Sequence, residues 1–204
     1  DMAQPQHTRN DAHSGMPGLG HKSVYELYVE CRATQNGVIN LNTYNIKDCA
    51  ELTYTGYPDV VFARYSDFFS THDGMGLGLA DYSNSGFFSA GTALGNNSYP
   101  NPSNDPRRYL EQDTIAYPDG SITSHLVGTV PDNLNPSLAA TATLATKSLW
   151  YQFLIESGKE EYLGYSLDLT NYVDMANLLI PRAVAYSAGL LNHFFRGRLA
   201  VSPP

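Results

Sequence analysis

The sequence predicts a mainly α-helical fold, a bundle of helices with a small β-hairpin excursion. Three observations lead to it. Several segments repeat apolar residues at helical spacing, the longest of them covers residues 169–197, and strand-like alternation is confined to one stretch around Pro118-Asp119-Gly120. The chain of 204 residues is 42% hydrophobic and contains 15 Tyr and 8 Phe, which is enough apolar material for a buried core.

We expect residues 1–204 to form one mainly helical domain. Its first helix is predicted over residues 21–33, where Val24, Leu27 and Tyr28 recur at helical spacing after a Pro- and Gly-rich break. A second helix is predicted over residues 57–72, since Pro58 and Asp59 suit a first helical turn.

Residues 74–92 predict a third helix, although glycines are frequent in it. Residues 100–135 are rich in Pro, Asn and Asp and predict an insertion of loop and β-hairpin that turns at Pro118-Asp119-Gly120. A fourth helix is predicted over residues 136–158.

The last helix is predicted over residues 169–197, and it should be central, because its apolar residues extend beyond one stripe. Residues 199–204 resemble a linker.

The charge of the chain limits the partners that it can bind. A formal net charge of −8 and only 12 Lys and Arg argue against a stable complex with nucleic acid, which clustered basic residues hold. The sequence contains neither a run of about 18 apolar residues nor the basic and apolar order of a signal peptide. We therefore expect no transmembrane segment.

Cys31 and Cys49 enclose an Asn-rich segment. A disulfide between them would stabilise this polar loop by roughly 3 kcal/mol, and it would indicate a secreted or periplasmic protein. The alternative is two unpaired thiols. We favour the disulfide, because a polar loop of this kind has little core of its own.

The first 26 residues concentrate side chains that bind metals. They contain three of the six histidines together with several acids: Asp1, His7, Asp11, His13, His21 and Glu26. Imidazole nitrogen and carboxylate oxygen are zinc ligands. A solvated polar arm is the alternative, and density alone does not separate the two. The remaining histidines carry weaker signals: His72 and His125 suit surface or capping positions, and His193 suits a core or boundary position.

The spacing of these residues favours a metal site. "DMAQPQH" resembles the "GD-x-x-Q-P-x-H" signature of the zinc-dependent phospholipase C and single-strand-specific nuclease superfamily, and "GHKSVYELYVE" is similar to the helix that follows it there. The resemblance implies a phospholipase C-like helical bundle of bacterial origin. Because the acid is Glu and follows Tyr, the phospholipase branch is the closer one.

The resemblance also implies the ligands. Asp1 would bridge two zinc ions, and His7, His21 and Glu26 would bind another, in a complete site of two or three ions. The family separates the last His and acid by four residues, whereas His21 and Glu26 are five apart. We therefore expect His21 to lie in the turn just before the helix, with His13 as the alternative ligand.

Further ligands of the family lie upstream of the shared Asp. We therefore expect the chain to be a C-terminal fragment of a larger polypeptide, with the upstream fragment as a second chain. The implied reaction is zinc-dependent hydrolysis of a phospholipid to diacylglycerol and a phosphorylated head group. No catalytic side chain is assigned beyond the metal ligands. The alternatives are a single-strand-specific zinc nuclease and a non-catalytic, metal-stabilised binding module of a secreted protein.

Overall fold

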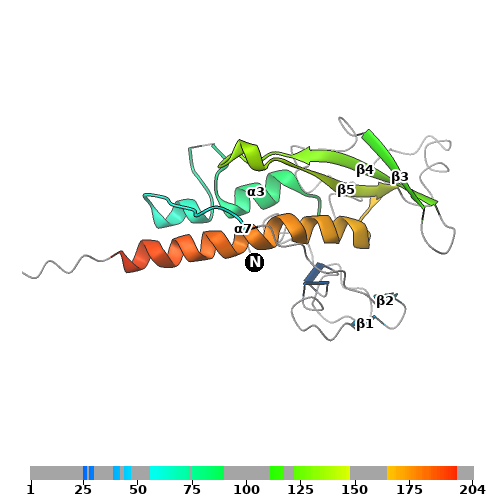
Figure 1. Cartoon of the computed structure of the whole chain (residues 1–204), viewed down its shortest axis with the longest axis horizontal. Coiled ribbons are helices and arrows are strands. Elements are labelled where there is room, and N and C mark those ends of the chain that lie inside the picture. The colour runs from blue at the N-terminus through cyan, green and yellow to red at the C-terminus, as the bar shows by residue number, and fades with distance from the viewer. Residues whose placement is uncertain are drawn as a thin grey trace, which may run out of the picture.

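The fold is a four-stranded antiparallel sheet packed against one long helix, not the mainly helical bundle that the sequence predicts (Figure 1). The computed structural model describes the following residues: 25–26, 28–29, 39–41, 44–46, 56–73, 75–89, 111–116, 122–147 and 165–196. The tail 199–204 and most of the first 55 residues lie outside them, and the single domain over residues 1–204 stays a prediction.

The sheet has the strand order β3-β4-β5-β6, with every neighbouring pair antiparallel. Its strands are β3 (Glu111–Ala116), β4 (Ile122–Val130), β5 (Ala140–Lys147) and β6 (Tyr165–Ser166). The predicted hairpin is present, since β3 and β4 pair on either side of Pro118-Asp119-Gly120. It is not an excursion, because β4 also pairs with β5 and extends the sheet. A separate two-stranded hairpin joins β1 (Ile39–Leu41) to β2 (Tyr44–Ile46).

The helix predicted over residues 136–158 is wrong in its described part. A short 3₁₀ turn, η2 (Pro136–Leu138), leads directly into β5. Thr141, Thr143 and Thr146 are β-branched and favour extended backbone, and β5 pairs with β4 along its length except at Leu144 and Lys147. Pairing with β4 therefore overrides the helical propensity of the alanines that lie between these threonines.

The helix predicted over residues 57–72 is also wrong. The chain runs extended through Val60 and Phe62, and only η1 (Tyr65–Phe68) forms a 3₁₀ turn. The extended segment lies against α7 (Leu169–Phe195), where the buried Val60 and Phe68 pack with Tyr186. Packing along a helix surface has replaced local helix formation.

The third predicted helix is present in part, and the last almost completely. α3 (Leu79–Gly86) occupies the middle of the range 74–92. Its N-cap is Gly78, where an added Cβ would lie 2.4 Å from the carbonyl oxygen of Phe69, so only glycine fits. α7 matches the prediction over 169–197 to within two residues and contains Pro181. No helix among the described residues is long and apolar enough to cross a membrane.

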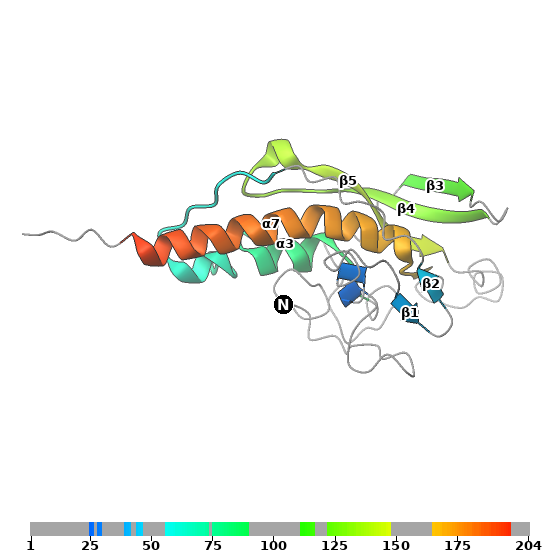
Figure 2. The ribbon, with the colours of Figure 1, turned by 60° about the horizontal axis from the view of Figure 1, so that its bottom comes forward.

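The core has two parts that both lie on α7. The larger part joins the N-terminal half of α7 to the sheet, to α3 and to the helical residues near position 25; it consists of Tyr25, Tyr28, Tyr82, Phe87, Phe88, Val130, Ala142, Leu144, Tyr172, Met175, Ala176 and Leu179. The smaller part joins the C-terminal half of α7 to η1 and α3. Figure 2 shows α7 running under the sheet and extending past its end.

Candidate metal centre

Glu26 is the one predicted metal ligand that lies within the described residues. It is helical and partly buried, as the prediction of a helix over 21–33 requires. Asp1, His7 and His21, and the alternative ligand His13, lie outside the described part of the chain, as do Cys31 and Cys49. The convergence of the four predicted ligands therefore stays a prediction.

The segment that carries Glu26 is fixed by two buried tyrosines. Tyr25 is 3% exposed and Tyr28 is 1% exposed, and both belong to the larger core. The ring centroid of Tyr25 lies 6.1 Å from that of Tyr172 on α7, at an angle typical of aromatic packing. Burial raises the pKa of Tyr25, and the neighbouring Tyr28 raises it further, so the phenol stays neutral.

This anchoring sets the direction of the Glu26 side chain. Residues three apart share one face of a helix, so Tyr25 and Tyr28 direct that face into the core. Glu26 lies about 100° from Tyr25 and about 160° from Tyr28 around the helix axis, so it points away from the middle of this face, although its side chain is still partly buried.

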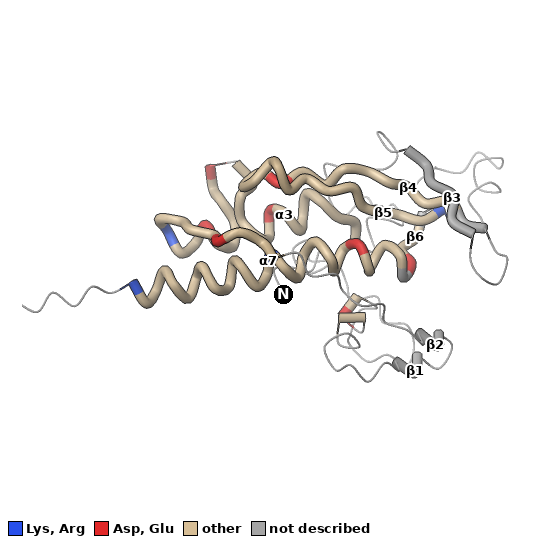
Figure 3. Tube along the Cα trace, viewed as in Figure 1, with Lys and Arg blue, Asp and Glu red and all other residues tan. Residues whose placement is uncertain are grey.

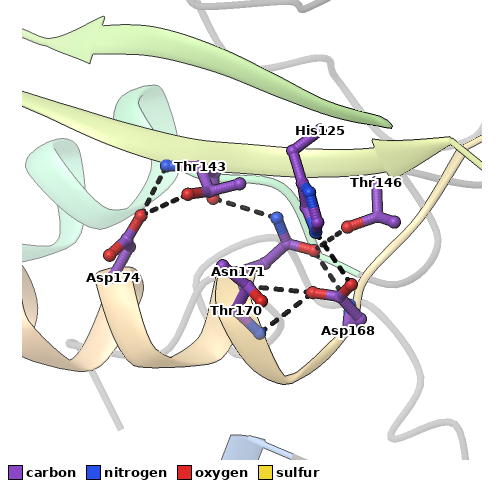
Figure 4. Close-up of polar contacts among 7 residues, drawn as sticks. All are labelled: His125, Thr143, Thr146, Asp168, Thr170, Asn171 and Asp174. Atoms are coloured by element: carbon purple, nitrogen blue, oxygen red, sulfur yellow. Dashed lines mark hydrogen bonds and ion pairs between the residues drawn. The ribbon is translucent and has the colours of Figure 1, made fainter. Parts of the chain in front are cut away.

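α7, the helix that receives Tyr25, is fixed at its first turn by a reciprocal cap. Asp168 Oδ1 accepts hydrogen bonds from the backbone N–H of Thr170 at 2.9 Å and of Asn171 at 3.3 Å, and Asn171 Oδ1 accepts one from the Asp168 N–H at 2.8 Å (Figure 4). These bonds satisfy backbone donors that a helix N-terminus otherwise leaves without partners. The sequence "DLTN" at 168–171 carries this signal, which the sequence analysis missed.

The same turn is joined to β5 by side chains (Figure 4). Asn171, which is buried, donates to the Thr143 carbonyl at 3.0 Å and accepts from Thr146 Oγ1 at 2.8 Å. Asp174 Oδ2, one turn further along α7, accepts from the Thr143 N–H at 2.7 Å and from its hydroxyl at 2.5 Å. The helix therefore cannot slide along the strand without breaking buried polar contacts.

His125 on β4 completes this network. Its Nε2 lies 3.0 Å from Asp168 Oδ2, and its side chain is fully buried. Of the two positions predicted for His125, surface or capping, the surface one is wrong, because the buried side chain contacts Asp168, the capping residue of α7. His125 pairs with Thr146 on β5, and both side chains face the first turn of α7, where Thr146 contacts Asn171. His193, by contrast, lies at a boundary as predicted, partly buried beside Phe68 and Phe194.

Together these contacts form a scaffold rather than a metal-binding group. Within the described ranges, no three His, Cys, Asp or Glu side chains gather closely enough to hold a metal ion. The network around Asp168 instead positions α7, and α7 positions Tyr25 and hence Glu26. Comparisons with protein-family models, with curated proteins and with solved structures found no match to this chain.

Proposed function

We propose that the chain is part of a zinc-dependent phosphodiester hydrolase of the phospholipase C type, secreted or periplasmic, that cleaves phospholipids. The observation that carries the proposal is the spacing of Asp1, His7, His21 and Glu26, together with the tyrosine that precedes the glutamate.

The donor set suits zinc. Two imidazoles and two carboxylates supply the nitrogen and oxygen ligands that zinc takes in hydrolytic sites, and Glu26 stands on a helical segment held by two buried rings. Zinc bound there would supply Lewis-acid chemistry, which stabilises negative charge on the phosphodiester and makes water a nucleophile near neutral pH. Tyr25 and Tyr28 hold the carboxylate in position, because their packing on α7 leaves the helix little freedom to rotate.

A phospholipid is favoured over a nucleic acid as substrate. A nuclease that acts on single strands needs exposed aromatic faces on which bases stack. Tyr25 and Tyr28, the aromatic residues beside the predicted ligand, are buried and present no such face. The low content of Lys and Arg points in the same direction.

The test compares two substrates and one pair of variants in the full-length polypeptide. With added zinc, we expect release of diacylglycerol from phosphatidylcholine and no cleavage of single-stranded DNA. Glu26→Gln should lower the activity by at least tenfold and the bound zinc by about one ion, whereas the exposed Asp59→Asn should change neither. Cleavage of DNA alone would contradict the phospholipase proposal. An inactive protein that holds one zinc ion or none would identify a binding module instead.

A further inference from the structure

The C-terminal half of α7 presents an apolar stripe with no described element packed on it. Val184, Leu191 and Phe195 are 56%, 59% and 80% exposed, and Ala188 between them is also exposed. Figures 1 and 2 show this half of the helix extending past the end of the sheet. An apolar patch of this kind on a helix marks an interaction surface rather than an ordinary solvated face.

The stripe has the spacing of a helix-pairing seam. Its members follow one another at intervals of four, three and four residues, as in the apolar positions of a coiled coil. The opposite face of the same turns is already used, because Tyr186 is buried and Gly189 meets the backbone of Val60. The seam therefore points away from the molecule's own core.

The charge distribution favours a second copy of this chain as the occupant. Residues 183–195 contain no Lys, Arg, Asp or Glu, whereas the chain as a whole has a formal net charge of −8 (Figure 3). Two copies that meet elsewhere on an acidic surface repel each other, but on this seam they bring no like charges together.

The sizes of the side chains favour an antiparallel arrangement. A two-fold axis between Gly189 and Leu190 places Phe195 of one copy opposite Val184 of the other, and Leu191 opposite Ala188. Each layer then pairs a large side chain with a smaller one, as efficient core packing requires. In a parallel pair, Phe195 would face Phe195 and Ala188 would face Ala188, which crowds one layer and leaves the other loose.

We propose that the chain forms a reversible antiparallel homodimer through Val184, Ala188, Leu191 and Phe195. Two copies of such a seam, with Phe194 at its margin, bury on the order of 1,000 Å² in total, at the lower end of specific interfaces. Interfaces of this size are typical of weak and reversible association, so we expect the dimer to predominate only at high protein concentration. This proposal is independent of the hydrolase proposal.

The test measures mass in solution by sedimentation velocity over a range of concentrations. The wild-type chain should pass from monomer to dimer, and Leu191→Glu should remain a monomer with an unchanged circular dichroism spectrum, because the new charges meet near the two-fold axis. Met75→Glu is the matched control: Met75 is 58% exposed and outside the seam, and this variant should dimerise like the wild type. A wild-type chain that stays monomeric, or a dimer that survives Leu191→Glu, overturns the proposal.

Cross-linking tests the direction of the pair. Val184→Cys and Phe195→Cys chains, mixed and oxidised, should form a covalent dimer that neither chain forms alone, with the wild-type chain as background control for Cys31 and Cys49. Cross-links within the separate samples would contradict the antiparallel pair. Flotation with phosphatidylcholine and phosphatidylglycerol vesicles tests whether the seam binds a lipid surface instead. If the wild-type chain floats as a monomer and Leu191→Glu does not float, the seam binds lipid and the dimer proposal is overturned.

Discussion

Arg182 and Asp132 form a buried ion pair that links the middle of α7 to the segment after β4. Arg182 Nη2 lies 2.8 Å and Nε 3.1 Å from the same oxygen, Asp132 Oδ2, and the two side chains are 4% and 2% exposed. The Tyr57 hydroxyl donates to this oxygen at 2.8 Å, and the guanidinium lies over the ring of Tyr82, 4.1 Å from its centroid. The pair is therefore surrounded by partners that satisfy both charges.

Asp132→Ala should destabilise the protein by about 3–5 kcal/mol, because it leaves the charge of Arg182 buried without its counter-ion. Urea unfolding followed by circular dichroism measures the loss. Asp59→Asn, at an exposed position, should change the free energy of unfolding by no more than about 0.5 kcal/mol. A loss below about 1 kcal/mol for Asp132→Ala would show that water reaches the guanidinium.

The network at the start of α7 predicts that three substitutions lower the stability of the protein to different degrees. Asp168→Ala removes the helix cap and the partner of His125 Nε2, and should cost about 2 kcal/mol. Asn171→Ala removes bonds to both Thr143 and Thr146 in a fully buried place, and should cost at least as much. Asp168→Asn, which retains a capping oxygen, should recover part of the loss. If all three variants were as stable as the wild type, the network at the start of α7 would not contribute to stability.

α7 is the element that the sequence specifies best. Its helical periodicity is long enough to outweigh Pro181, and both ends agree with the structure to within two residues. β5 shows the opposite case. Leu138, Ala142 and Ala145 match a helical stripe, but Thr141 and Thr143 match a strand equally well, and the choice is made by pairing with β4. A partner strand from another part of the chain is not visible in the local pattern.

The candidate site likewise combines a local motif, which the sequence shows, with contacts between distant residues, which it does not show. The motif around Asp1 and His7 is a local signal, so the sequence suffices to predict ligands, and of these the structure describes Glu26 alone. The supporting contacts are not local: Tyr25 packs on Tyr172, and His125 meets Asp168, which lies 43 residues further along the chain. Such contacts join residues far apart in the chain, and they depend on a topology that periodicity does not specify.

Tyr25 offers a test that connects stability with metal binding. Tyr25→Ala should destabilise the protein by about 3–5 kcal/mol through loss of a buried ring, and Tyr25→Phe by about 1 kcal/mol or less, because the ring is kept. If this ring holds Glu26 in place, zinc affinity should fall in Tyr25→Ala and stay near that of the wild type in Tyr25→Phe. Titration with zinc under conditions in which both variants are folded measures this. If both variants bind zinc with the affinity of the wild type, the Tyr25 ring does not hold Glu26 in position for the metal.

The buried tyrosines predict a loss of stability at high pH. Burial is the main cause that raises their pKa, and the group comprises Tyr25, Tyr57, Tyr82, Tyr172 and Tyr186. Below pH about 10 these phenols are neutral in both the folded and the unfolded chain, so their contribution is fully present. Above it, the unfolded chain loses protons that the folded chain keeps, and the free energy of unfolding falls.

At pH about 11, Tyr25 and Tyr172 should each lower the free energy of unfolding by about 1 kcal/mol. Urea unfolding between pH about 8 and 11 measures the slope. The double variant Tyr25→Phe with Tyr172→Phe should show a shallower decline, and an unchanged slope would assign the effect to other groups.

Gly189 tests whether α7 and the extended segment before η1 meet as closely as the structure has them. Alanine is the better helix former by about 1 kcal/mol, so Gly189→Ala would stabilise a solvated helix. Here a Cβ at this position would lie 2.2 Å from the Val60 carbonyl oxygen and 2.7 Å from Phe68 Cε1, and the first of these is backbone that cannot rotate away. We therefore expect the opposite sign, a loss of about 1–3 kcal/mol, as is typical of overpacked sites.

Asn192→Ala, on the exposed face of the same helix, is the matched control and should gain a few tenths of a kcal/mol. Thermal unfolding of both variants decides the matter: if Gly189→Ala is stabilised like Asn192→Ala, the extended segment does not pack on α7 in solution.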